Sequence, residues 1–462
     1  MKKVLIFLLL VFLMGCADQP ENDMGNNAYE LNAYLDTEND TLTVSGTLSY
    51  KNDDYDLDEL YLTLYPNAVN PSSRDENVLF SSLSINGEET NYEIAGDDDT
   101  QIHINLKKTL KHQTRISIEF SYMFNYWSDD RIADYGNYYL TMFFYPFVAM
   151  YDDEGWNIDA YTFSGESYYN EIGDYDVTIN VPADYLIAAS GAIVSKIEED
   201  GRQISRYQIN DARDFSFAAS SDYHLYEFET EEISYEIYSI RDISAFEQYT
   251  VQTTLENTFD FYENAIGDYP YDHFTLELGN YYGMESSGVI YCSSEISTET
   301  IIHECIHQWF YSMVGNDQSD ESFLDEAMTT YMTSLYYYEL YGLAGYNAML
   351  DYRDSLQTRL VERYQVSLGD SMFRKVDEFG DLYAMEIYYH GPTMIRYYVD
   401  EFMDGDVERF YEIISTYFNT YKFEIATIDE WLDLLEEETG IDNTKEWFMM
   451  QMSEIQDLDN RP

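Results

Sequence analysis

The sequence HECIH at residues 303–307 contains two histidines four positions apart, with a glutamate directly after the first. Ser297 before it is a suitable N-cap and Gly315 after it is a suitable C-cap, so the sequence predicts a helix that runs to Val314. Residues four positions apart project from one face of a helix, which brings the two imidazoles within reach of one ion. The pattern therefore predicts a metal site in which Glu304 stands beside two histidine ligands.

A catalytic zinc keeps three protein ligands and one open position for water, so His303 and His307 need a third partner. Glu326 supplies it, with eighteen residues between it and His307. It lies in a second predicted helix, from about Ser322 to Tyr341, and a turn over residues 315–317 allows the two helices to meet. Two histidines and one glutamate suit zinc, and we expect one zinc ion as the cofactor.

Four motifs, taken in order, resemble those of the gluzincin metallopeptidases of the aminopeptidase N and leukotriene hydrolase family. They are the zinc helix, the glutamate eighteen residues on, the upstream segment YGMES at 282–286 and the downstream segment YYHG at 388–391. Flanking phrases such as GDYPYDHF and FSFAASSDY extend the resemblance over most of residues 30–400. The resemblance implies a zinc metallopeptidase: an N-terminal antiparallel β-sandwich domain, then a thermolysin-like α+β peptidase domain with a short helical C-terminal tail.

The resemblance also implies a role for each matching residue. Glu304 would act first as general base and then as general acid, and Tyr388 would donate a hydrogen bond to the oxyanion. Glu285 would pair with the free α-ammonium of the substrate, and the strand at Gly283 and Met284 would present its backbone to an extended peptide. An enzyme of this kind removes N-terminal residues from peptides that have a free N-terminus.

The chain departs from the family pattern in three places. The first Gly and last Asn of the upstream motif are replaced by Tyr282 and Ser286. The second amine-binding residue of the family has only Glu154 and Glu166 as candidates. Few residues follow Tyr388, so the long helical domain that closes the site in large members is absent or vestigial, and we expect a more open cleft.

These departures leave two alternatives to the aminopeptidase open. The first is a zinc endopeptidase of the same fold that does not require a free amine. The second is a non-catalytic, peptide-binding lipoprotein. The sign of such a protein would be a missing ligand, base or oxyanion donor, and the sequence retains all three.

The N-terminus predicts export. Two lysines precede eleven apolar residues, Val4–Met14, which is the length of a secretory signal and too short to span a membrane. The run LMGC at 13–16 resembles a bacterial lipobox, so we expect residues 1–16 to be a lipoprotein signal peptide and Cys16 to be acylated. Residues 17–27 then form a flexible tether to a lipid anchor on the extracellular face of the cell membrane.

Hydrophobic alternation divides the remainder of the chain. From 28 to 228 the pattern has period two and predicts an antiparallel sandwich in which no chemistry is obvious. Residues 229–400 form the predicted catalytic domain and 401–462 a helical tail. In that tail, Thr427 and Glu430 fit a capping box ahead of a helix that Gly440 ends.

The composition excludes several classes of partner. Lys plus Arg number 24 against 88 Asp plus Glu, a formal net charge of −64, so binding to nucleic acid or anionic lipid through basic patches is excluded. Contact with the membrane is then expected through the lipid anchor only. Cys292 and Cys305 are the two cysteines left after Cys16; we expect both to be buried and the fold not to depend on disulfides.

Overall fold

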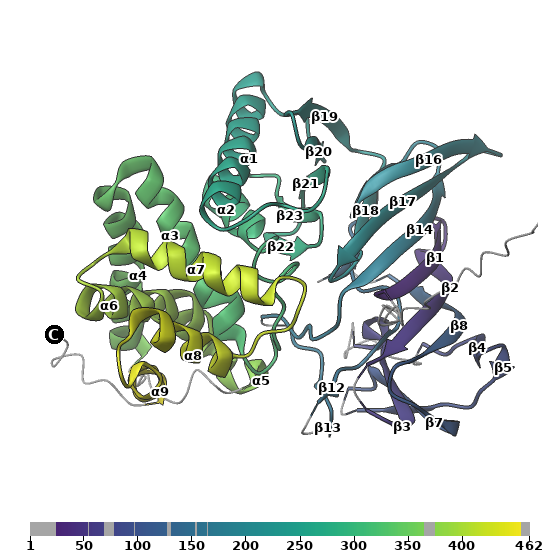
Figure 1. Ribbon diagram of the computed structural model, residues 1–462. Helices are drawn as coiled ribbons and strands as arrows, with labels where there is room; N and C mark the ends of the chain where they lie inside the picture. The colour runs from purple at the N-terminus through teal and green to yellow at the C-terminus, as the bar shows by residue number, and fades with distance from the viewer. Residues whose placement is uncertain are drawn as a thin grey trace, which may run out of the picture.

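The structure is a computed structural model that describes residues 25–53, 55–68, 78–96, 98–126, 131–152, 155–163, 165–364 and 375–453. The predicted signal peptide, Cys16 and Glu154 lie outside the described residues. Figure 1 shows a sheet-rich half, which contains the first part of the chain, and a largely helical half, which contains the second. The order is the one predicted, a β domain followed by an α+β domain with C-terminal helices.

The β domain is made of short and medium strands. Their bounds are β1 (Asn27–Asp36), β2 (Thr41–Asn52), β3 (Leu57–Thr63), β4 (Ser82–Ile85), β5 (Glu88–Glu89), β6 (Glu93–Ala95), β7 (Gln101–Leu110), β8 (Thr114–Asn125), β9 (Ile132–Asp134), β10 (Tyr138–Thr141), β11 (Phe147–Val148), β12 (Tyr151–Asp152), β13 (Gly155–Trp156), β14 (Gly173–Pro182), β15 (Leu186–Ala189), β16 (Ala192–Glu199), β17 (Arg202–Ala212) and β18 (Phe217–Ser220). The largest sheet has the order β16-β17-β14-β1-β2-β8-β4-β5, and two smaller sheets have the orders β15-β18-β10-β9 and β11-β3-β7-β6.

Period-two alternation accounts for the core of this domain. Buried positions alternate with partly or fully exposed ones along β1 and along β14, as the sequence predicts. The buried side chains are often tyrosines that pack face to face or edge to face. Tyr29 stacks on Tyr175 with ring centroids 4.6 Å apart, and Tyr145 packs edge-on against both.

One strand pairing departs from the antiparallel arrangement that the sequence predicts. β1 and β14 run parallel, from Asn27 opposite Gly173 to Tyr34 opposite Asn180. Parallel neighbours need a long connection, and strands β2 to β13 supply it here. Alternation shows which face of a strand is buried but not which strand lies beside it, so this pair could not be predicted from the sequence.

The second half contains the sheet that faces the helices. Its strands are β19 (His224–Glu229), β20 (Ser234–Ser239), β21 (His273–Gly279), β22 (Gly283–Ser286) and β23 (Val289–Ser293), in the order β19-β20-β21-β23-β22. Strand β22 therefore lies at one edge of this sheet. Because β19 pairs with β20, we place the division between the domains before His224 rather than at residue 228.

The helices share one core with this sheet. They are α1 (Ala245–Ala265), α2 (Thr298–Ile306), α3 (Met328–Tyr341), α4 (Leu343–Tyr364), α5 (Val376–Phe379), α6 (Gly391–Phe402), α7 (Val407–Tyr421), α8 (Ile428–Thr439) and α9 (Thr444–Ser453). Side chains of the C-terminal helices belong to the same hydrophobic cluster as those of α1 to α3. Tyr411 donates to the carbonyl of Leu335, and Ser415 donates to that of Ile266. The predicted helical tail is thus packed onto the catalytic domain (Figure 1).

The predicted capping residues can be compared with the helix ends in the structure. Ser297 caps α2, and the Thr427–Glu430 capping box and the left-handed Gly440 bound α8, as predicted. The prediction that the zinc helix reaches Val314 is wrong, because α2 ends at Ile306. The chain turns there so that Trp309, fully buried, can donate its indole N–H to the carbonyl of Gly267.

Two further expectations can be compared with the described residues. Cys292 and Cys305 are free, buried thiols, as expected. No described helix combines the length and the apolar composition that crossing a membrane requires.

Candidate active site

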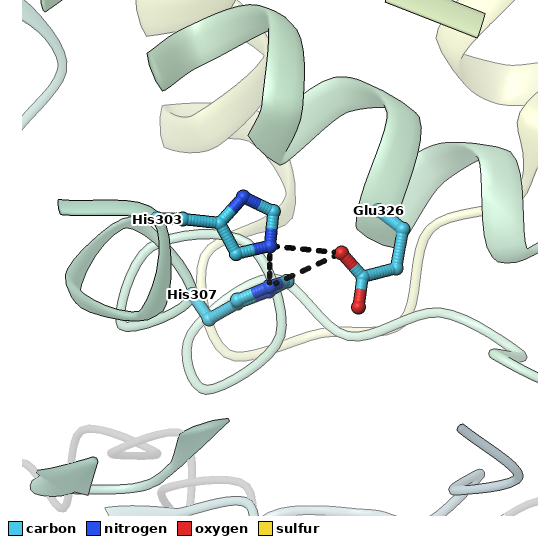
Figure 2. Close-up of side chains that lie close together, drawn as sticks. All are labelled: His303, His307 and Glu326. Atoms are coloured by element: carbon cyan, nitrogen blue, oxygen red, sulfur yellow. Dashed lines mark hydrogen bonds and ion pairs between the residues drawn. The ribbon is translucent and has the colours of Figure 1, made fainter. Parts of the chain in front are cut away.

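Three potential metal ligands converge between α2 and the segment before α3 (Figure 2). His303 Nε2 lies 2.9 Å from Glu326 Oε2 and 3.2 Å from His307 Nε2, and His307 Nε2 lies 3.6 Å from the same Glu326 oxygen. Ligand atoms of a tetrahedral zinc are about 3.3–3.6 Å apart, given bonds of about 2.0–2.2 Å. The spacing and the chemistry of these atoms therefore fit one zinc ion.

Local structure places each ligand. His303 lies in the last turn of α2, and His307 is its C-terminal cap, so both imidazoles leave the helix on one side. Glu326 lies in a π-helical turn, Phe323–Ala327, that leads directly into α3. Such a turn widens the helix by one residue and is frequent at functional sites.

A second carboxylate holds one of the two imidazoles. Asp325 Oδ1 lies 3.1 Å from His307 Nδ1, on the side of the ring opposite the three converging atoms. His307 Nδ1 also lies 3.0 Å from the carbonyl oxygen of Phe310. Partners of this kind fix the orientation and tautomer of a metal-binding histidine. Asp325 was not identified from the sequence, although it adjoins Glu326.

The charges of the three ligand candidates suit a cation. Burial lowers the pKa of His303 despite the hydrogen bond to Glu326, so this imidazole is neutral. Burial opposes ionisation of Glu326, but its contacts with His303 and His307 lower its pKa well below the usual value. Burial also lowers the pKa of His307, yet the carboxylates of Glu285 and Asp325 outweigh it and raise that pKa. The surroundings of His307 thus favour a positive charge, which a divalent ion would supply.

Glu304 lies beside the ligand trio and is only 6% exposed. Burial raises its pKa well above the usual value; the nearby His307 opposes the rise and the carboxylate of Glu285 reinforces it. A carboxyl group of this kind can take up and hold a proton near neutral pH. A Cβ at Gly283 would lie 2.4 Å from Glu304 Oε1, so the glycine leaves room for this carboxylate.

Tyr388 approaches the same site from a second π-helical turn, Met385–His390. Its ring centroid lies 6.1 Å from that of His303. Burial, reinforced by the carboxylate of Glu326, raises the pKa of Tyr388 well above its usual value. The phenol therefore keeps its proton and can donate it in a hydrogen bond.

The edge strand β22 brings the predicted amine-binding residue to the site. Glu285 is 2% exposed, and its carboxylate accepts a hydrogen bond of 3.3 Å from Gln318 Nε2. Its carboxylate lies within 4.8 Å of the nearest side-chain atoms of His307 and Asp325. Met284 points the other way, and its sulfur accepts a hydrogen bond from Arg131 Nε at 3.4 Å.

The β domain contributes a further carboxylate, that of Glu166, which is one of the two candidates for the second amine-binding residue. A carboxylate oxygen of Glu166 lies within 4.8 Å of ligand atoms of Asp325 and Glu326. Arg131 Nη2 pairs with Glu166 Oε1 at 3.2 Å, and Tyr383 donates to the other oxygen at 3.4 Å. Burial and the carboxylate of Glu326 raise the pKa of Glu166 well above its usual value.

Residues 253–454 match the family model described as Peptidase family M1 domain. The chain carries a peptidase family M1 domain. The predicted resemblance to the aminopeptidase N group is thereby confirmed, and the predicted class, a zinc metallopeptidase, is confirmed at the level of the family. The sequence matches no curated protein.

Solved structures match nearly the whole chain. An M1 zinc metallopeptidase variant from Deinococcus radiodurans has a TM-score of 0.68 at 13% identity, covering 94% of this chain and 95% of that one. The same variant bound to a Tyr-Ser-Ala substrate gives 0.66 at 14%, covering 94% of each chain. A structure described as a two domain M1 zinc metallopeptidase bound to L-arginine gives 0.67 at 14%, also covering 94% of each. These likenesses confirm the predicted two-domain fold.

Some residues of the candidate site had little or no signal in the sequence. Arg131 had no signal, because a lone arginine in a β domain is normally a surface residue. Glu166 was a candidate only by its position in the chain. Gln318 lies between the two ligand helices, where the sequence indicated a turn; its amide donates to Glu285 and, at 2.9 Å, to Asp325 Oδ2.

Proposed function

We propose that this M1 protein is a zinc-dependent aminopeptidase that holds one zinc ion on His303, His307 and Glu326. The observation that carries the proposal is the pair of buried carboxylates, Glu285 and Glu166, beside the three ligand candidates. When bound, zinc supplies Lewis-acid chemistry: it polarises a carbonyl and lowers the pKa of a bound water toward about 7.

Residues of the chain provide proton transfer, oxyanion stabilisation and backbone contacts to the peptide. Glu304 takes a proton from the attacking water and passes it to the amine that leaves, a role that its raised pKa suits. Tyr388 donates its O–H to the carbonyl oxygen as negative charge develops there. The edge strand β22 offers backbone groups at Gly283 to an extended peptide.

Amine recognition makes the proposed enzyme an exopeptidase. Glu285 lies on β22 and Glu166 in the β domain, and the carboxylate of Glu285 contributes to the raised pKa of Glu166, so we propose that both pair with the substrate ammonium. The pair Arg131–Glu166 fixes the second carboxylate without exposing it to water. A peptide held by its first ammonium presents only its first peptide bond to the metal site.

A peptide and its N-acetylated twin test the proposal. We expect the free-amine peptide to have a kcat/KM about 100-fold higher, because acetylation removes a charge-assisted pair worth about 1.5–3 kcal/mol. The measurement is turnover of both peptides by the same zinc-loaded preparation. Equal rates would instead support the endopeptidase alternative, in which Glu285 holds no ammonium.

We also propose that the enzyme works at the outer surface of the cell membrane, anchored through acylated Cys16. The lipobox-like run at 13–16 supports this. Growth with a labelled fatty acid tests it, since label should enter the wild-type protein but not Cys16→Ala. Equal labelling of the two proteins would remove the anchor from the proposal.

A further inference from the structure

The turn between β22 and β23 lies one residue after Glu285. Ser286 pairs with Val289 across it, and Gly288 adopts the positive φ of 74° that the tight turn requires. Ser286 and Ser287 are fully buried. Any movement of this turn therefore moves Glu285 relative to the metal site.

Gln308 joins this turn to the zinc helix. Its amide nitrogen donates to the carbonyl of Ser286 at 3.0 Å, and its carbonyl accepts from the backbone N–H of Gly288 at 2.9 Å. Gln308 is fully buried and directly follows His307. One side chain thus connects the backbone of a metal ligand candidate with both ends of the turn.

Asp214 holds the same turn from the β domain. Its two carboxylate oxygens accept hydrogen bonds from the hydroxyl of Ser286 and, at 2.7 Å, from the backbone N–H of Ser287. Ser216 donates to the Ser286 hydroxyl at 2.6 Å, so that hydroxyl both donates and accepts. The turn is therefore fixed by hydrogen bonds from both domains.

We infer that Gln308 and Asp214 are positioning residues that set the location of Glu285, and with it the selectivity for a free amine. The inference rests on the proposed function, since it assumes that Glu285 binds the substrate ammonium. Neither residue contacts the three ligand candidates through its side chain, so their loss leaves the metal ligands in place. They act on the substrate through the β22–β23 turn.

Gln308→Met tests the inference, because methionine has a similar size and makes neither hydrogen bond. We expect the ratio of kcat/KM for a free-amine peptide to that for its N-acetylated twin to fall about tenfold, with zinc content unchanged. The free-amine peptide should show a raised KM, whereas a general structural defect would lower the rates on both peptides alike. Gln203→Met is the matched control. Gln203 is also a buried glutamine but lies in the β domain, so this variant should show the wild-type ratio of the two kcat/KM values.

The possible outcomes distinguish a failure of the inference about Gln308 from a failure of the proposed aminopeptidase function. A wild-type ratio near 100 that Gln308→Met retains would overturn the inference and leave the aminopeptidase proposal standing. A wild-type ratio near one would overturn the proposed function and this inference with it. If Gln308→Met does not fold, Asp214→Asn takes its place, since an asparagine can still accept from Ser287 but no longer serves both donors; a retained ratio then overturns the inference.

Discussion

Buried carboxylates at two places in the structure have different surroundings. At the candidate metal site, five carboxylates lie near two imidazoles and one guanidinium; they are Glu166, Glu285, Glu304, Asp325 and Glu326. Glu277, in β21, is also fully buried, but within the described part of the chain it forms no ion pair. It accepts hydrogen bonds from Tyr223 at 2.8 Å and Tyr138 at 3.4 Å, both from the β-domain side.

The difference shows two ways in which a protein can bury an acid. At the metal site, contact with His303 and His307 lowers the pKa of Glu326, which keeps its negative charge and suits a cation. Burial raises the pKa of the other four carboxylates, so a bound cation would favour their ionised forms. At Glu277, burial raises the pKa to about 8, and the group is neutralised by a proton instead. The two imidazoles thus distinguish Glu326 from Glu277, whose described partners are tyrosine hydroxyls.

The largest effect expected from this comparison is that of Glu304→Gln. The substitution keeps the size of the side chain but removes the group that accepts and returns the proton. We expect zinc content to stay at the wild-type level and peptide turnover to fall about 10⁴-fold. Turnover close to wild type at matched zinc content would remove Glu304 from the mechanism.

A smaller loss is expected for Tyr388→Phe, which removes one hydroxyl beside the ligand trio. Loss of a single oxyanion donor typically lowers kcat about 10²–10³-fold. The measurement is kcat on a saturating peptide, with Tyr389→Phe as the matched control on the neighbouring tyrosine. An equal effect of both substitutions would contradict the assignment of the donor to Tyr388.

The smallest effect on activity is expected for Glu277→Gln, which changes a buried carboxylate outside the candidate metal site. A carboxyl group whose pKa rises from 4.5 unfolded to about 8 folded binds more protons in the folded state between those values. Glu277 should therefore make the wild-type protein lose stability as pH rises from about 4.5 to 8, by roughly 1.4 kcal/mol per pH unit at most, and the glutamine variant should lack this contribution.

Denaturant unfolding of both proteins at pH 5.5, 7 and 9 measures this effect. We expect the free energy of unfolding of Glu277→Gln to rise relative to wild type with each step, while peptide turnover at pH 7 stays within about twofold. A difference between the two proteins that does not change with pH would show that Glu277 is ionised in the folded state.

The parts of the site that the sequence predicted are those that are local or regularly spaced. His303 and His307 follow from helical periodicity, and Glu326 from its place in the next helix. The end of α2 at Ile306 could not be predicted, because residues 308–314 are compatible with a helix and only the burial of Trp309 beside Gly267 turns the chain. Tertiary packing overrides local preference at such a point.

Other residues reach the site only because the two domains pack together, and local sequence does not predict such long-range packing. Arg131 and Glu166 precede the zinc motif by well over one hundred residues, and nothing in their neighbourhood marks them as buried. The parallel pairing of β1 with β14 has the same cause, since its partners are distant in the chain.

The class of chemistry could be predicted from the sequence alone, because the type and the helical spacing of the ligands are local properties that do not depend on the tertiary fold. The packed structure brings His303, His307 and Glu326 together and leaves Glu277 apart from them, beside two tyrosine hydroxyls. That outcome depends on burial and on distances between side chains of different elements, and these exist only once the two domains are packed together.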